Sequence, residues 1–263
     1  MSPSVETVLA PNPGPYTGPG TNTYVVVDGG EIAVIDPGPV VEGHLAAILQ
    51  AVGDRTPVAV LATHTHDDHA PLSNPLARRL DVPVYGYEPG PAFDPDVRLR
   101  DGDSVRVGNS AIEAVHTPGH TADHLCFMMG ERLFTGDHIM GGSTVVMEDA
   151  AAYLDSLYRV RDLGVGRIEP GHGPAMDDAG AVIDAYIDHR RAREQQILSS
   201  IRGGAGTVDA IVDAVYASVP DELRAAAAHQ VIVQLRKLSA DELVWFRAGE
   251  MGPSTMVELN AEW

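Results

Sequence analysis

The chain contains little cysteine, little lysine and few aromatic residues. Its 263 residues include a single cysteine, so an internal disulfide is excluded. That residue, Cys126, lies in the apolar stretch 125–129, where a small core residue is expected more than a catalytic thiol. Lys237 is the one lysine among 18 basic residues. Aromatic content is only 5%, but the hydrophobic fraction of 44% is ordinary and argues against disorder on the scale of a domain.

Segments that direct a chain to a membrane are also missing. No run approaches the roughly 18 apolar residues that a transmembrane helix needs. The first residues, MSPSVETV, lack the basic segment followed by an apolar segment that is typical of a secretory signal. We therefore expect a soluble, cytoplasmic protein that has no membrane partner.

Positive charge is scarce. The formal net charge is −19 at pH 7, which disfavours a surface that binds polyanions in general. A local basic patch or bound cations could still reverse the sign in one cleft.

Hydrophobic periodicity predicts an α/β layered domain. Residues 11–21, PNPGPYTGPGT, form a loop because proline and glycine alternate through them. The expected strands are 23–28, 31–36, 57–62, 82–85, 104–107, 111–115, 124–129, 132–134 and 167–169, and the expected helices are 40–52, 72–80, 149–163 and a long one from a cap at Asp177 to about Arg202.

The run Gly203-Gly204-Ala205-Gly206 is the clearest linker, and it divides the chain into domains 1–202 and 203–263. Two helices, 208–217 and 221–238, then precede two short strands, which is the order of a winged-helix module. From residue 207 onward, four basic residues stand against nine acidic ones. That balance argues against sequence-specific DNA binding. We expect the module to pack on the catalytic domain, to shape the rim of a cleft or to support a homodimer.

The most informative stretch is His64-Thr65-His66-Asp67-Asp68-His69. It follows the apolar strand 57–62, and a buried strand fixes where the side chains at its tip point. Clustered histidine and aspartate at such a place indicate a metal site.

Three further candidate ligands follow predicted strands and lie in turns rich in glycine or proline: His120, Asp137 and His172. Together with the first cluster they supply five histidines and two aspartates. That exceeds what one four-coordinate zinc uses, so two divalent metals are the economical interpretation. The ligands are all nitrogen and oxygen, which suits zinc best and leaves manganese or iron possible.

The pattern H-x-H-x-D-H, followed by His120, Asp137 and His172, resembles the metallo-β-lactamase fold hydrolases. The resemblance implies an αββα sandwich that holds two metals at one edge. It implies that the first metal is held by His64, His66 and His120, the second by Asp68, His69 and His172, and that Asp137 bridges them.

Segments along nearly the whole chain look like the β-lactamase-like protein 2 family. Examples are Gly20-Thr21-Asn22-Thr23-Tyr24, Thr117-Pro118-Gly119-His120-Thr121, Gly142-Ser143-Thr144-Val145-Val146 and Pro170-Gly171-His172-Gly173-Pro174. That family carries a C-terminal winged-helix-like extension and is associated with metal-dependent cleavage of single-stranded RNA.

The hypothesis from the residues is hydrolysis by a hydroxide that bridges two metals, with Asp68 as the catalytic carboxylate that orients it. The resemblance favours single-stranded RNA as the substrate. The alternatives are a thioester or lactone hydrolase of the glyoxalase II type and, more distantly, a non-catalytic binding protein. A redox di-iron site is disfavoured, since superfamily members of that type usually have a carboxylate in place of His66.

Five polar residues are candidate substrate contacts. Each of them also has a purely structural interpretation: buried turn capping for Asn22, Ser143 and Thr144, and a solvated helix face for His189 and Arg190.

Overall fold

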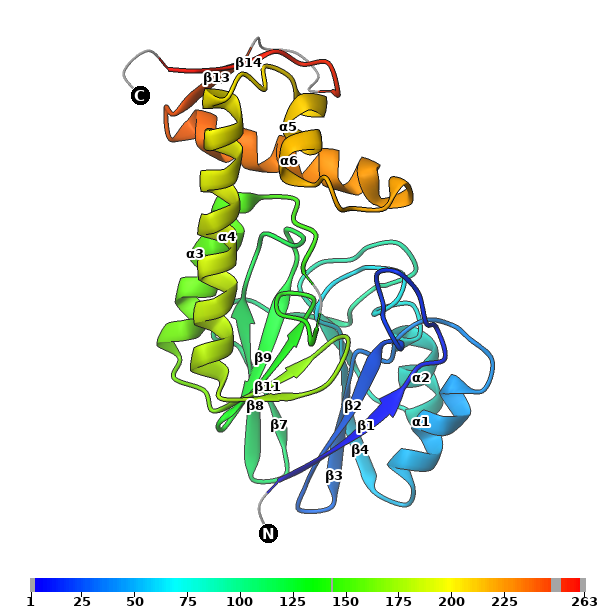
Figure 1. Cartoon of the computed structure of the whole chain (residues 1–263). Coiled ribbons are helices and arrows are strands. Elements are labelled where there is room, and N and C mark those ends of the chain that lie inside the picture. The colour runs from blue at the N-terminus through cyan, green and yellow to red at the C-terminus, as the bar shows by residue number, and fades with distance from the viewer. Residues whose placement is uncertain (1–2, 143, 247–251, 261–263) are drawn as a thin grey trace.

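Two six-stranded sheets form the body of the molecule in the computed structural model, which describes residues 3–142, 144–246 and 252–260 (Figure 1). The first sheet has the order β1-β2-β3-β4-β5-β6: Ser4–Leu9, Asn22–Asp28, Glu31–Ile35, Thr56–Leu61, Val84–Gly86 and Val97–Arg98. The second has the order β12-β11-β10-β9-β8-β7: Met176–Asp177, Arg167–Pro170, Arg132–Gly136, Leu125–Met129, Ser110–His116 and Ser104–Val107.

The space between the sheets is an apolar core, and each sheet contributes every second side chain to it. In β2, Tyr24 and Val26 face the other sheet, whereas Val25 faces the helices α1 (His44–Val52) and α2 (Ser73–Leu80). This alternation follows from the two-residue period of a strand.

The second sheet shows the same division. Phe134 of β10 packs between the sheets, and its neighbour Leu133 packs outward against the helices α3 (Ala150–Asp162) and α4 (Ala179–Arg202). The four layers are therefore helix, sheet, sheet and helix, which confirms the predicted αββα sandwich (Figure 1).

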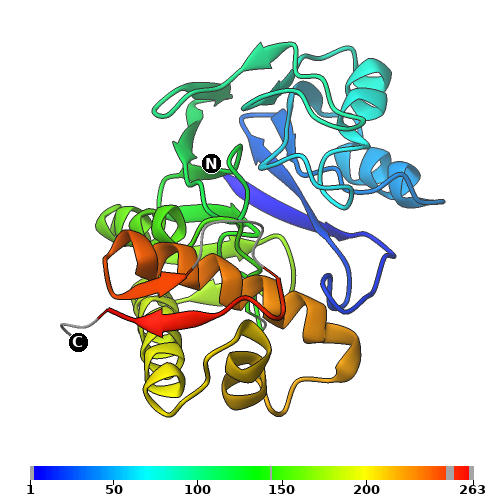
Figure 2. The same cartoon turned by 90° about the horizontal axis from the view of Figure 1, so that it is seen from above.

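The C-terminal part is a smaller unit with its own core. It contains α5 (Val208–Val215), the short helix η1 (Asp221–Leu223), α6 (Arg224–Ala240) and the antiparallel pair β13 (Val244–Phe246) and β14 (Val257–Leu259). The last turns of α4 contribute Ile197 and Leu198 to this core, so one long helix takes part in both units. Seen from above, the C-terminal unit lies over the second sheet and its helices (Figure 2).

Three details differ from the expectations. Strand β1, the edge of the first sheet, was not predicted, and neither were the two-residue strands β6 and β12. Helix α4 is capped by Asp178, whose carboxylate accepts from the backbone of Ala181, and not by Asp177. Asp177 instead pairs with Arg167 across β11 and β12. Short strands depend on a neighbour for their hydrogen bonds, so their own residues carry little signal.

The buried position of Cys126 agrees with the expected core residue. Among the described residues, no helix has both the length and the apolar character needed to cross a bilayer.

Replacing Phe127 with alanine is expected to lower the free energy of unfolding by about 3–5 kcal/mol, because the ring is fully buried between the sheets. Val40→Ala, at a side chain that is 68% exposed, is expected to change it by less than about 0.5 kcal/mol. Chemical denaturation followed by circular dichroism measures both. Equal losses in the two variants would contradict this picture of the core.

Candidate metal centre

The candidate ligands lie at one edge of the sandwich because of how the strands run. Strands β8 and β10 are both antiparallel to β9, and β11 is parallel to β10, so all three end at the same edge of the second sheet. His120, Asp137 and His172 follow these three ends, and the histidine cluster follows β4 of the first sheet. Four loops thus bring seven side chains together.

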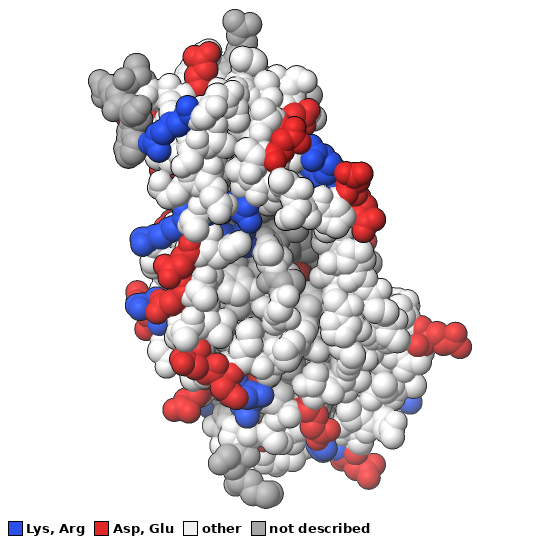
Figure 3. All heavy atoms as spheres, viewed as in Figure 1, with Lys and Arg blue, Asp and Glu red and all other residues white. Residues whose placement is uncertain are grey.

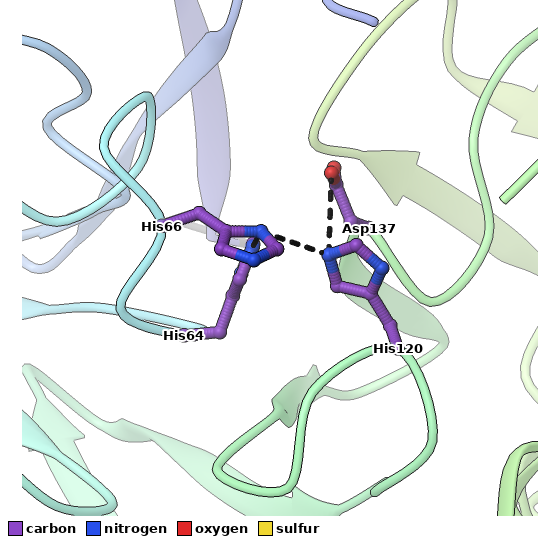
Figure 4. A group of neighbouring side chains, drawn as sticks. All are labelled: His64, His66, His120 and Asp137. Carbon is purple, nitrogen blue, oxygen red and sulfur yellow. Dashed lines mark hydrogen bonds and ion pairs between the residues drawn. The ribbon is translucent and has the colours of Figure 1, made fainter. Parts of the chain in front are cut away.

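These side chains form two groups that share Asp137. The first group contains His64, His66, His120 and Asp137, and the second contains Asp68, His69, Asp137 and His172; within each group the candidate ligand atoms all lie within 4.8 Å of one another. Figure 4 shows the first group: His64 and His66 come from one loop, and His120 and Asp137 approach from two others.

Asp67, between the two parts of the cluster, is exposed and belongs to neither group. The geometry therefore brings together all seven residues that the sequence pattern singled out.

The distances within the groups fit a bound cation. Nδ1 of His66 lies 2.9 Å from Nε2 of His64 and 3.0 Å from Nε2 of His120, and the Nε2 atoms of His69 and His172 are 3.2 Å apart. Two nitrogens bound to one tetrahedral zinc at ~2.05 Å would lie ~3.3 Å apart, which is close to these values.

The environment of Asp137 is a second observation that fits a bound cation. Its Oδ1 is buried and has no hydrogen-bond partner among the described residues, although the Nε2 atoms of His69 and His172 lie 3.2 Å away. A buried carboxylate oxygen without a partner is costly, and a cation held between the groups would satisfy it.

The far nitrogen of each buried histidine in the two groups is fixed by a hydrogen bond. Nδ1 of His69 donates to Asp36 (2.9 Å), and that of His172 donates to the carbonyl of Gly20 (3.1 Å). Nδ1 of His120 donates to the carbonyl of Val146 (2.6 Å). These contacts leave Nε2 as the ring nitrogen that faces the group, which is the arrangement expected of metal-binding histidines.

His64 follows the same rule through a hydroxyl. The hydroxyl of Thr63 donates to Asp36 (2.8 Å), so it accepts from Nδ1 of His64 (3.0 Å). Asp36 therefore supports one histidine of each group, and it also accepts from the backbone of Thr63.

Asp36 is the important residue that the sequence interpretation missed. It is 2% exposed and has a positive φ of 48° directly after β3. The signal was present, since Asp36-Pro37-Gly38 is another polar residue in a turn at a strand end.

A glycine admits the closest backbone approach to the groups. A Cβ atom on Gly171 would lie 2.7 Å from Cε1 of His69 and 2.8 Å from Oδ1 of Asp137. Only glycine therefore fits between these ligands and His172.

The two groups differ in protonation. Burial and the neighbouring imidazoles hold the pKa of His64 well below its usual range, and burial also lowers the pKa of His120. Burial opposes protonation of His69 as well, but Asp137 and Asp36 outweigh it and raise its pKa well above the usual range. For His172, the carboxylates of Asp137 and Asp68 overcome burial and raise the pKa to about 9. His64 and His120 are thus ready as neutral ligands, whereas a metal must displace protons from His69 and His172.

A cavity of about 330 Å³ opens beside both groups. Its walls come from the N-terminal loop, from the ligand loops, from the segment after β10 and from α6 of the C-terminal unit. The described residues that line it are Pro15, Tyr16, His66, Asp68, His120, Asp137, Met140, Thr144, Val146, Glu148, Ala226 and His229. The sequence interpretation did not single out Tyr16, Glu148 or His229, because nothing local marks a residue that faces a cavity between two units.

The predicted substrate contacts differ in their position relative to the cavity. Thr144 lines the cavity, and with His189 it also borders a separate surface hollow. Asn22 is buried, and its amide donates to the carbonyls of Pro170 and Gly173.

Arg190 is 6% exposed and donates to the carbonyl of Val145. Neither Asn22 nor Arg190 is among the residues that line the cavity. Ser143 lies outside the described residues.

Adding zinc to metal-free protein is expected to raise Tm, because the ion binds the folded chain and not the unfolded one. At a free concentration of 100 times Kd the gain is about 2.7 kcal/mol per site. Calorimetry and metal analysis should give two ions per chain and a lower Tm after chelation.

His66→Ala should lose metal and His189→Ala should not, since His189 belongs to neither group. Two intact sites in His66→Ala would refute the assignment.

Family models match two parts of the chain. The metallo-beta-lactamase superfamily matches residues 16–90 and 86–172, and the beta-lactamase associated winged helix domain matches residues 207–249. The second match confirms the predicted winged-helix module.

Individual proteins show the same likeness. A Beta-lactamase-like protein 2 homolog from Caenorhabditis elegans is 33% identical over 260 residues, which are 93% of this chain and 87% of the relative. An Atrochrysone carboxyl ACP thioesterase from Aspergillus chevalieri is 35% identical over 263 residues, 94% of this chain and 84% of the relative. The crystal structure of a metallo-beta-lactamase family protein from Thermus thermophilus superposes with a TM-score of 0.79 at 20% identity, over 97% of this chain and 98% of that chain. The chain belongs to the metallo-β-lactamase superfamily of hydrolases and carries the winged helix domain associated with it.

Proposed function

We propose that the protein is a two-metal hydrolase that cleaves an ester or thioester of an uncharged acyl group. The observation that carries this proposal is the composition of the cavity beside the ligand groups. None of its described lining residues is lysine or arginine. Part of its wall is apolar and is formed by Pro15, Met140, Val146 and Ala226. An uncharged acyl chain can bury its surface there without a counter-charge.

Single-stranded RNA, the substrate that the sequence resemblance favours, needs cations along its path. Affinity for a nucleic acid comes largely from lysine and arginine that neutralise phosphates. Figure 3 shows a hollow between the catalytic sandwich and the C-terminal unit, with basic and acidic side chains on the surface around it. The described residues that line the cavity itself include no lysine or arginine. Cleavage of RNA stays a prediction, and no described residue of the cavity favours it.

The thioesterase relative supports the same choice. The relative from Aspergillus chevalieri is named as an ACP thioesterase, and the likeness extends over 94% of this chain. Fold and metals alone do not select a substrate, so this support is added to that of the cavity and does not replace it.

The metals would be held by the two groups that share Asp137. When bound, the pair of ions acidifies a water molecule and polarises the reacting carbonyl. Zinc suits these nitrogen and oxygen ligands best, and manganese or iron also fit.

Asp68 is suited to orient that water. Its side chain is 26% exposed and lines the cavity, while one oxygen lies 3.1 Å from Nε2 of His172. Burial opposes ionisation, but His69 and His172 lower the pKa of Asp68 below its usual value. The carboxylate is therefore ionised at neutral pH and accepts a hydrogen bond from the water.

Asp68→Asn is expected to lower kcat by about 100-fold or more, because the uncharged amide is a weaker hydrogen-bond acceptor than the carboxylate and cannot take up a proton. Asp67→Asn is the matched control, since its side chain is exposed and outside both groups. The assay compares S-lactoylglutathione, a short acyl thioester, a bis-p-nitrophenyl phosphodiester and single-stranded RNA on protein of measured metal content. Turnover of RNA without turnover of any thioester would overturn the proposal, and so would an active Asp68→Asn variant.

His229 is expected to contact the bound substrate, because it is exposed on α6 and lines the cavity. His229→Ala should raise KM about 5-fold with little change in kcat, which corresponds to one lost hydrogen bond of ~1 kcal/mol. Arg236→Ala, at an exposed position further along the same helix, is the control. Steady-state kinetics on the best thioester distinguish the two variants, and an unchanged KM in His229→Ala would exclude the contact.

A further inference from the structure

The segment 145–149, hereafter the strap, joins a candidate metal ligand to the C-terminal unit. Three successive carbonyls of the strap each accept a hydrogen bond from a different part of the molecule. Val145 accepts from Arg190 of α4 (2.8 Å), Val146 from Nδ1 of His120 (2.6 Å), and Met147 from the amide of Gln230 on α6 (3.0 Å).

Gln230 binds the strap with both ends of its amide. Its Nε2 donates to the carbonyl of Met147, and its Oε1 accepts from the backbone N–H of Met147 (3.2 Å). The side chain is 8% exposed, so water does not replace these bonds. A buried glutamine is tolerated only where its polar atoms are paired, and here both pairs are with one residue of the catalytic domain.

The geometry links Gln230 to His120 through a single peptide unit. The carbonyl of Val146 and the N–H of Met147 belong to the same peptide bond, which is planar. His120 donates to one end of that plane, and Gln230 accepts from the other. Holding the N–H therefore fixes the direction of the carbonyl to which the imidazole is tied.

The other end of the strap is fixed to the turn that carries His120. The backbone N–H groups of Glu148 and Asp149 donate to the carbonyl of Gly119 (2.8 and 3.0 Å). Gly119 has a φ of +132°, and a Cβ there would clash with the backbone nitrogen of Tyr153, so this turn has little room to shift. The strap thus holds His120 from two sides, and Gln230 is the link to the C-terminal unit.

We propose that Gln230 is a positioning residue for the metal centre. Through the Val146–Met147 peptide it orients the His120 ring and sets the affinity of the first group for its ion. The C-terminal unit then contributes to the metal centre as well as to the cavity wall. This inference rests on the metal centre of the proposed function, and it is independent of the substrate.

The test uses Gln230→Met in the full-length protein, since methionine keeps the length and removes both hydrogen bonds. Gln234→Met is the matched control. Gln234 lies one turn further along α6, is 2% exposed, and makes no hydrogen bond to the strap in the described part of the chain. Gln230→Ala is a second variant in case the first packs poorly.

Metal-free protein is titrated with zinc against a chromophoric chelator, and the visible spectrum of the cobalt-loaded protein reports ligand geometry. Gln230→Met should weaken one of the two binding events by about 10–100-fold, the usual effect of removing a partner of a metal ligand. Its cobalt spectrum should change, while Gln234→Met should match the wild type in both measurements. Circular dichroism and Tm check that each variant is folded.

Wild-type affinity for both ions in folded Gln230→Met or Gln230→Ala would overturn the proposal. Equal weakening in Gln230→Met and Gln234→Met would also overturn it, because that result indicates general loosening of the C-terminal unit. A wild-type protein that binds two ions but hydrolyses no thioester would refute the proposed substrate and leave this proposal intact. A wild-type protein that binds no metal would overturn both.

Discussion

The hydrogen bond on the far nitrogen of each buried candidate ligand histidine is the interaction on which the centre depends. Without it, imidazoles from three loops would turn away from one another, since nearby nitrogen lone pairs repel. Asp36 holds His69 directly and His64 through Thr63, and backbone carbonyls hold His120 and His172. The sheets supply rigid strand ends, and the hydrogen bonds convert those positions into ring orientations.

The protein is strongly acidic, and the cavity beside the metal centre has no basic side chains among its described lining residues. The chain has a net charge of −19, and the described cavity lining contains three carboxylates but no lysine or arginine. Metal ions would supply the positive charge at the reacting atoms, which is sufficient for one acyl carbonyl. A polyanion needs a longer path of cations. The winged helix unit contributes Ala226 and His229 to the wall of this cavity, and its excess of acidic residues disfavours the binding of phosphate.

Much of the site could be predicted from local sequence, and the failures have a common cause. His64, His66, Asp68 and His69 were identifiable because a buried strand ends in ligating residues. Asn22 and Arg190 were possible substrate contacts, but in the structure their side chains donate hydrogen bonds to backbone carbonyls. Residue type predicts which hydrogen bonds a side chain can make, and packing decides with which partner it makes them.

The sequence by itself indicated an α/β layered domain, a cluster of candidate ligands and the order of the C-terminal helices and strands, because these follow from periodicity and from residues at strand ends. The αββα sandwich was implied by the family resemblance. Only the tertiary structure decided which parts of the molecule the residues of α6 contact. His229 and Gln230 are neighbours in the chain, but one lines the cavity and the other binds Met147, 83 residues away. Successive residues of a helix point about 100° apart, so which surface each one meets depends on how the helix is packed. A contact across that distance leaves no periodic trace in the sequence.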